Sequence, residues 1–355
     1  MYSLVESISN FDWCYLIYEF LMKATTALML AGSWVYLPLI VGSANANECA
    51  KKPLDDTLAN RIAAVAMNEY ATFNGHQIDA NGRLWKFGST ETENGPLLDP
   101  ETGKPNPSAA RHPAWRRVWE YWLVLDKHVP GIALSRKVIA VPGALTGDNE
   151  DAATTEKTLN ELFSKLKSEP SAASESLRQA TLRAALSDSP WSAAFISFVM
   201  HQAGFDNQQF RYAAAHWQYV KQAFGMEQRN AYRACDPRYT RPSKGDLLCY
   251  SRNAMAPDDF KGWLNAVHQP GFAAASHCEV VVMVDQVSRK METIGGNVFQ
   301  SVARRRLKLN GHGVLSASHY AGSAGGRLSV ACMQDRSCHQ ANLNIHRWSV
   351  LLQLQ

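Results

Sequence analysis

The order of hydrophobic patterns along the chain is the feature that most constrains its fold. Apolar residues first recur at helical spacing, up to about residue 224, and from residue 245 they form short strand-like runs bounded by turn residues. Helices that precede a group of strands are typical of an α+β fold, whereas a doubly wound fold would alternate the two. We therefore predict an α+β fold with a helical part packed on an antiparallel β-sheet.

The periodic segments fix the expected elements. The predicted helices cover residues 55–73, 114–129, 158–167, 174–187, 190–204 and 207–224. The predicted strands cover residues 245–252, 277–287, 290–298, 299–309 and 344–354. An aromatic stripe at helical spacing is interpreted as core; it consists of Trp115, Val118, Trp119, Trp122 and Leu123. Residues 74–112 and 253–276 lack a period and are interpreted as insertions, with a short ordered piece at 84–88 and possible lid aromatics at Trp263 and Phe272.

The first 46 residues have the pattern of a leader. Met22 and Lys23 precede an apolar run over residues 24–41, and small residues then lead to Ala46. This arrangement predicts a secretory signal peptide that starts at Met22 and is cleaved after Ala46. An uncleaved membrane anchor is the rival interpretation, because the run approaches the roughly 20 residues that span a bilayer. We expect an exported protein, periplasmic or extracellular, with no stable membrane span after cleavage.

The number and spacing of the cysteines indicate disulfide bonds. Six cysteines follow the leader, namely Cys49, Cys235, Cys249, Cys278, Cys332 and Cys338. An even number in an exported chain favours disulfides over a zinc site, since no C-x-x-C spacing is present. Cys249 with Cys278, across two strands, and Cys332 with Cys338, around a short loop, are the pairs most readily proposed, and the full pairing stays open.

The net charge is mildly basic. The chain has 36 basic and 32 acidic side chains, and loss of the leader raises the net charge from +4 to +6. Such an excess could favour an anionic partner such as a cell-wall polymer, but it is too small and too scattered to indicate nucleic acid. The one dense basic run, residues 304–306, is interpreted as a solvated strand face.

Ser192 is the candidate nucleophile. It falls in the first turn of the helix predicted at residues 190–204, with Asp188 or Ser189 as the N-cap and Pro190 at the first helical position. Backbone N–H groups at a helix start lack intrahelical acceptors, and they could stabilise an oxyanion beside the hydroxyl. The structural alternative is a small capping-type serine.

Two further residues complete a possible catalytic set. His277 opens an apolar strand, and Asn297 follows two glycines at the end of the next one. An antiparallel hairpin would bring them side by side, so that His277 acts as general base and then acid while Asn297 orients its ring. Each residue alone is better explained as structural, but the three together favour catalysis.

Four motifs carry a resemblance to known enzymes. In chain order they are PWSAAFISFVMHQAG, KGDLLCYSR, a strand that opens with His277, and IGGNV. This set resembles the NlpC-like and CHAP-type amidases of the papain-like superfamily, in which a cysteine nucleophile begins a helix and a strand-borne histidine is its base. The chain is also similar to an uncharacterised bacterial group, domain-of-unknown-function family 2272, from about residue 60 to about residue 310. The resemblance implies one papain-like α+β domain over residues 47–355.

One departure from the resemblance changes the expected chemistry. Ser192 stands where those amidases have cysteine, and a hydroxyl must lose its proton to the base during attack. Candidate substrate-binding residues are Trp191, His216 and Asp246; a core histidine is an equally good interpretation of His216.

These features together predict an exported hydrolase of peptide or amide bonds, acting on peptidoglycan with a Ser-His-Asn site and no cofactor or metal. The first alternative is a catalytically inactive wall-binding or assembly module that retains the fold. An antibacterial amidase effector is a minor alternative. The oligomeric state stays open.

Overall fold

The computed structural model describes residues 49, 56–93, 113–133, 172–187, 189–225, 229–253, 255–321 and 342–355. All of them belong to the unit Asn45–Gln355. The predicted leader, the helix predicted at residues 158–167 and the predicted Cys332–Cys338 pair lie outside the described residues.

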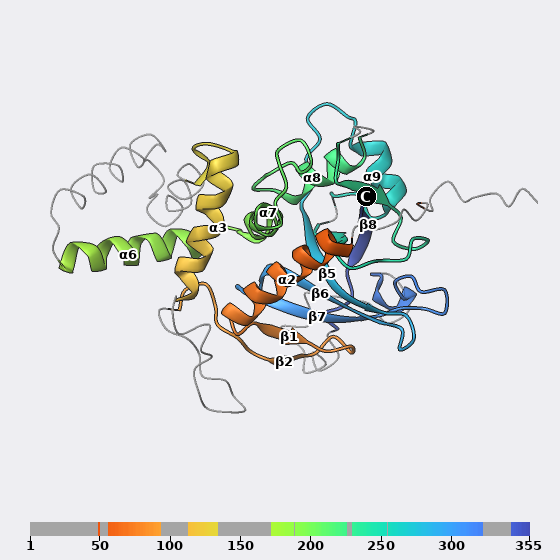
Figure 1. Cartoon of the computed structure of the whole chain (residues 1–355), viewed down its shortest axis with the longest axis horizontal. Helices are drawn as coiled ribbons and strands as arrows, with labels where there is room; N and C mark the ends of the chain where they lie inside the picture. Colours follow the sequence, from red (N-terminus) through yellow and green to blue (C-terminus); the bar gives the residue numbers. More distant parts are fainter. Residues whose placement is uncertain are drawn as a thin grey trace, which may run out of the picture. The chain divides into compact units, whose positions relative to one another are not determined.

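One sheet organises the described part of the chain. Its eight strands follow the order β2-β1-β7-β6-β5-β4-β8-β3. Figure 1 labels the six strands β1, β2, β5, β6, β7 and β8. The strands are β1 (His76–Ile78), β2 (Leu84–Lys86), β3 (Tyr232–Cys235), β4 (Leu247–Ser251), β5 (Ser276–Asp285), β6 (Lys290–Val298), β7 (Ser301–Lys308) and β8 (Arg347–Leu354). The predicted α+β class is confirmed, but the sheet is mixed rather than antiparallel, because β1 pairs with β7 in parallel.

The five predicted strands are present, and three more were missed. The missed strands β1, β2 and β3 have only three or four residues each. A period of two residues cannot be recognised over so short a length. The strands β1 and β2 lie in the segment predicted as an insertion, and β2 coincides with the short ordered piece predicted there at residues 84–88. Strand β1 joins this segment to the sheet by pairing with β7.

Six described helices accompany the sheet. They are α2 (Asp56–Thr72), α3 (Ala114–His128), α6 (Ala172–Ser187), α7 (Ser192–Gln202), α8 (His216–Ala223) and α9 (Phe260–Ala266). The helix predicted over residues 207–224 is wrong in its first half. There the Asp206 carboxylate accepts the backbone N–H groups of Gln208 and Gln209, both at 2.8 Å, which fixes a turn instead.

The helix α9 lies inside the second predicted insertion. Asp259 caps its start by accepting the Gly262 N–H at 2.8 Å. Its Trp263 is fully buried and donates its indole N–H to the Ser349 hydroxyl at 3.0 Å. The prediction that Trp263 belongs to a lid is therefore wrong, because its ring is part of the core.

The helix α7 is the centre of the core. Its residues from Ser192 to Met200 are all buried, so it is apolar around nearly its whole circumference. It contacts α3 on one side and strands β5 and β6 on the other. Gly296 allows β6 to lie close to α7, since a Cβ at this position would lie 2.5 Å from Phe195 Cβ. This glycine brings the end of β6 against the start of α7.

Two residue-level expectations about the core are wrong. Leu123 is 43% exposed, because the buried face of α3 centres on Val118, Tyr121 and Trp122. Arg305 does not lie on a solvated face: it is 2% exposed and pairs with the buried Glu279 carboxylate at 3.0 Å. Alternation along β7 turns this arginine inward and its two arginine neighbours outward.

Two disulfides close the described fold. Cys249 pairs with Cys278 across β4 and β5, as the sequence suggested, and Cys49 pairs with Cys235 on β3. Both bonds fit an exported protein, because disulfides persist in oxidising compartments. Among the helices of the described residues, none is long and apolar enough to cross a membrane.

Peptide mapping of the unreduced protein should recover the cross-linked peptides of both disulfides of the described residues, one joining Cys49 to Cys235 and one joining Cys249 to Cys278. Each pair has its Cα atoms close enough for a bond, at 5.7 and 4.0 Å. Mass spectrometry before and after reduction gives the measurement, and a peptide joining Cys49 to any other cysteine would contradict the assignment.

Candidate active site

Ser192 is the first residue of α7. Trp191 occupies the N-cap position and makes no side-chain capping bond. The predicted start at Pro190 is two residues early, because the Ser189 N–H turns back to the Leu186 carbonyl at 3.2 Å and ends α6. The first-turn position predicted for Ser192 is confirmed. Its hydroxyl therefore stands beside the backbone N–H groups that open the helix.

The nearest base to Ser192 is His216. Its Nε2 lies 2.7 Å from Ser192 Oγ, and both residues are only 4% exposed. The other ring nitrogen, Nδ1, is hydrogen-bonded to the Tyr219 hydroxyl. His216 and Tyr219 are three residues apart on α8, so one helix face presents both groups. When Nδ1 carries the proton and donates it to the Tyr219 oxygen, Nε2 accepts the Ser192 hydroxyl.

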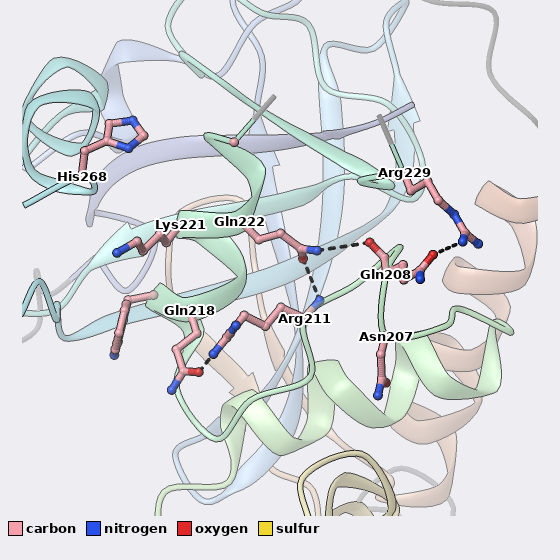
Figure 2. A pocket seen from close by; sticks show the side chains of 10 residues that line it. Asn207, Gln208, Arg211, Gln218, Lys221, Gln222, Arg229 and His268 are labelled. Atoms are coloured by element: carbon pink, nitrogen blue, oxygen red, sulfur yellow. Dashed lines mark hydrogen bonds between the residues drawn. The ribbon is translucent and has the colours of Figure 1, made fainter. Parts of the chain in front are cut away.

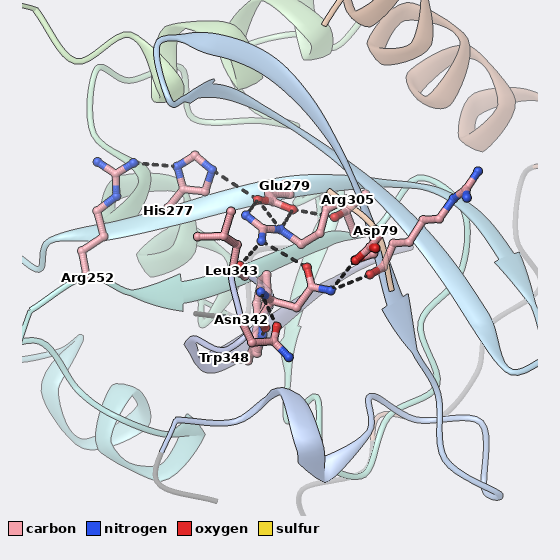
Figure 3. Close-up of polar contacts among 11 residues, drawn as sticks. Asp79, Arg252, His277, Glu279, Arg305, Asn342, Leu343 and Trp348 are labelled. Carbon is pink, nitrogen blue, oxygen red and sulfur yellow. Dashed lines mark hydrogen bonds and ion pairs between the residues drawn. The ribbon is translucent and has the colours of Figure 1, made fainter. Parts of the chain in front are cut away.

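His277 lies beside this pair. Its ring centroid is 5.0 Å from that of His216. Its Nδ1 is 3.1 Å from Arg252 Nη2, while its Nε2 is buried without a hydrogen bond, 3.7 Å from Glu279 Oε1 (Figure 3). Gly295 closes over this nitrogen, since a Cβ there would lie 2.9 Å from it. The histidine is therefore packed against His216 with no described hydrogen bond to Ser192.

Among the described contacts, Asn297 does not orient His277 as the sequence predicted. It is the last but one residue of β6 and has a left-handed conformation with φ of 54°, just before the turn that leads to β7. Among the hydrogen bonds of the described residues, none joins Asn297 to His277. Arg252 makes the bond to the ring that was expected from Asn297.

The two remaining predicted residues are enclosed by protein. Trp191 is fully buried, and its indole N–H donates to the Glu91 carboxylate. Asp246 is also fully buried, and its carboxylate accepts the Ser243 N–H at 2.7 Å and the Leu354 N–H at 2.9 Å. The Trp191 bond joins the residue before α7 to the segment after β2. The Asp246 bond to Leu354 joins the start of β4 to the end of β8.

A buried ion pair supports the strand that carries His277. Glu279 follows His277 on the same face of β5, and Arg305 reaches it from β7 across Thr293 (Figure 3). Arg305 also bonds to the Leu343 carbonyl and to Asn344. The charge of each partner is thus compensated, as burial of both groups requires.

Sequence reasoning missed Tyr219, Arg252 and Glu91. The i, i+3 spacing of His216 and Tyr219 was a usable signal, because those positions share a helix face. Arg252 and Glu91 had no such signal, since they approach the site from a strand end and from a turn after β2.

The electrostatics favour neutral imidazoles. Burial first, and then the Arg252 charge, lowers the pKa of His216 well below its usual 6.5. Burial and the same arginine also lower the pKa of His277. A neutral His216 can accept a proton from Ser192 at neutral pH.

The lowered His216 pKa predicts the acid limb of any hydrolytic activity. The active form is the unprotonated base, so activity is retained above the folded-state pKa and falls only when pH approaches it. We expect kcat/KM at pH 6 to stay within about twofold of that at pH 8. A base with a pKa of 6.5 would keep only about a quarter of its activity at pH 6. The pH profile of purified protein decides between the two, and a midpoint near 6.5 would contradict the assignment.

Neither of the two described cavities reaches the Ser192–His216 pair. The two described cavities, one along the outer side of α8 and one between α2 and α3, do not include Ser192, His216 or His277. Within the described ranges, no group of three histidine, cysteine or carboxylate side chains is placed to hold a metal ion.

Comparison with known proteins identifies a family. No curated protein and no solved structure matches the chain. Residues 110–354 match a bacterial family described as "Uncharacterized protein conserved in bacteria (DUF2272)". The matched range is more than half of the chain and contains Ser192, His216 and His277. The chain therefore belongs to this bacterial family of uncharacterised proteins.

Proposed function

We propose that the protein is an exported hydrolase of peptide or amide bonds in which Ser192 is the nucleophile and His216 the general base. The observation that carries the proposal is the 2.7 Å contact between Ser192 Oγ and His216 Nε2 at the start of a buried helix. The two disulfides support export.

The proposed reaction is acyl transfer. Ser192 Oγ attacks the carbonyl carbon while its proton passes to His216 Nε2, and the oxyanion faces the backbone N–H groups of the first turn of α7. His216 then gives that proton to the leaving nitrogen as the C–N bond breaks. Water then attacks the acyl carbon while His216 Nε2 takes its proton, and the same imidazole returns this proton to Ser192 Oγ as the ester bond breaks.

Tyr219 and His277 have supporting roles in this scheme. The Tyr219 oxygen is hydrogen-bonded to His216 Nδ1. When it accepts a proton from Nδ1, it favours the imidazole tautomer in which Nε2 is unprotonated and can accept the Ser192 proton. It carries no full charge, so it stabilises the imidazolium less than a carboxylate would. His277 packs its ring against His216 and limits its rotation.

Peptidoglycan is the proposed substrate. Support comes from the motif resemblance to NlpC-like and CHAP-type amidases and from the export expected for the chain. A helix-borne nucleophile beside a strand whose second residue is a histidine agrees with a papain-like arrangement, which we include in the proposal.

A wall-binding module without catalysis is the second candidate. It is favoured by the enclosure of the pair, since Ser192 and His216 are each 4% exposed, and by the serine in place of cysteine. The variant Ser192→Cys separates the two candidates. Cleavage that appears only in this variant would identify the natural protein as a binder, whereas cleavage by the natural protein supports the hydrolase.

The direct test uses purified sacculi. The natural protein should release soluble fragments, and Ser192→Ala should release none above background. Ser197→Ala is the matched control, because Ser197 is equally buried on the same helix but bonds to the Ala213 backbone. Mass spectrometry of the fragments gives the bond cut. Absence of fragments with the natural protein would contradict the proposed substrate.

A further inference from the structure

A polar groove runs along the outer side of α8, on the opposite face of the helix from His216. It encloses about 760 Å³ and receives side chains from the turn before α8, from α8 itself and from the segment after α9 (Figure 2). His216, Tyr219 and Val220 are buried, while Gln218, Lys221 and Gln222 line the groove. The same helix therefore carries the candidate base on one side and the groove on the other.

Arg211 is held in place across this groove by amides. Its backbone N–H donates to Gln222 Oε1 at 2.7 Å, and its side-chain Nε–H donates to Gln218 Oε1 at 3.3 Å (Figure 2). Gln222 is itself fixed, because its amide donates to the Gln208 carbonyl at 3.4 Å. A guanidinium that is oriented by neutral acceptors keeps its charge and its terminal N–H groups available for a ligand.

The groove is positively charged. Arg211, Lys221 and Arg229 contribute to its lining, and among the described lining residues there is no carboxylate. Arg229 pairs with Asp206 at 2.9 Å, where both side chains are at least half exposed. In the described part of the chain, no ion pair involves Arg211 or Lys221. A concave site with uncompensated cations concentrates anionic ligands.

An indole adds a second kind of recognition. Trp217 is half-buried in the lining and meets the ring of Phe272 edge-to-face, with centroids 6.0 Å apart. An indole face offers an apolar platform for the C–H face of a sugar ring, while glutamine and asparagine amides both donate to and accept from hydroxyl groups. Cations, amides and an indole together match a saccharide that also carries a negative charge.

We propose that this groove binds an acidic saccharide, with a sugar ring against Trp217 and a carboxylate at Arg211 and Lys221. The identification of that saccharide with part of the wall substrate rests on the proposed function. A glycan held there would lie along the helix that carries His216.

Binding is tested without turnover, in the Ser192→Ala protein, by titration with N-acetylmuramic acid, N-acetylglucosamine and inorganic phosphate. The two sugars share a ring and an N-acetyl group, and they differ in the lactyl ether that carries the carboxylate. The acidic sugar should bind at least about tenfold more tightly than the neutral one, because one charge-assisted contact is worth a factor of this size. Phosphate should bind more weakly than the acidic sugar, since it cannot contact Trp217.

Variants locate the site. Arg211→Gln and Lys221→Gln should each raise the dissociation constant of N-acetylmuramic acid about tenfold. Lys290→Gln is the matched control, because it removes the same charge from an exposed position at the start of β6. Equal binding of both sugars, equal binding of phosphate, no binding at all, or an equal effect of Lys290→Gln would each overturn the proposal. The titration measures binding and needs no cleavage. If the natural protein does not cleave sacculi, the hydrolase proposal fails, but the binding of an acidic saccharide in the groove is still tested by the titration.

Discussion

The variant His216→Ala should lose roughly 10²- to 10⁴-fold in kcat/KM for amide hydrolysis, the range expected when a general base is removed. The reason is the 2.7 Å contact of its Nε2 with Ser192 Oγ, the only base contact of that hydroxyl among the described hydrogen bonds. Without an acceptor, the hydroxyl must lose its proton to water. Kinetics on released fragments give the measurement, and circular dichroism confirms folding.

The control for this prediction is Asn297→Gly. It removes the side chain that sequence reasoning chose as the orienting group, and glycine tolerates the positive φ of 54° without strain. We expect its kcat/KM to stay within about threefold of the natural value. The reverse pattern, with a severe loss in Asn297→Gly and a mild one in His216→Ala, would restore the Ser-His-Asn site and contradict the present one.

The largest expected loss of stability comes from Arg305→Ala. The change leaves the Glu279 carboxylate, 1% exposed, without the arginine that compensates its charge at 3.0 Å. Breaking a buried pair in this way costs about 3–5 kcal/mol. Denaturant unfolding of both proteins gives the difference in free energy of unfolding.

The neighbouring arginine supplies a matched control. Arg306 pairs with Glu292 at 2.9 Å on the outer face, where its side chain is 45% exposed. Exposed pairs contribute about 0–1 kcal/mol, so Arg306→Ala should change stability by no more than that. Similar losses in the two variants would show that the inward and outward faces of β7 are wrongly assigned.

Much of the fold follows from local sequence patterns. Long periodic segments predicted α2, α3 and α7, and the apolar runs predicted strands β4 to β8. The β5–β6 hairpin was predictable because only a short turn separates the apolar run of β5 from that of β6. The short strands β1 and β3 were not, because they depend on partners far away in the sequence, β7 and β8.

The positions of the candidate residues in the fold were predictable from the sequence, but most of their hydrogen bonds were not. Ser192 at a helix start and His277 at a strand start follow from local pattern. The pairing of Ser192 with His216 depends on where the fold places the start of α8 relative to the start of α7, after a turn whose conformation Asp206 sets through side-chain bonds. The burial of Arg305 depends on strand register, which places it opposite Thr293 and beside Glu279.

Covalent labelling tests the central claim most directly. A fluorophosphonate reacts with a serine only where a base and an oxyanion site activate its hydroxyl, and it needs no knowledge of the natural substrate. Peptide mass spectrometry should find the adduct on Ser192 in the natural protein, and His216→Ala should reduce it to background. An unlabelled Ser192 in the folded natural protein, or labelling that His216→Ala leaves unchanged, would contradict the account.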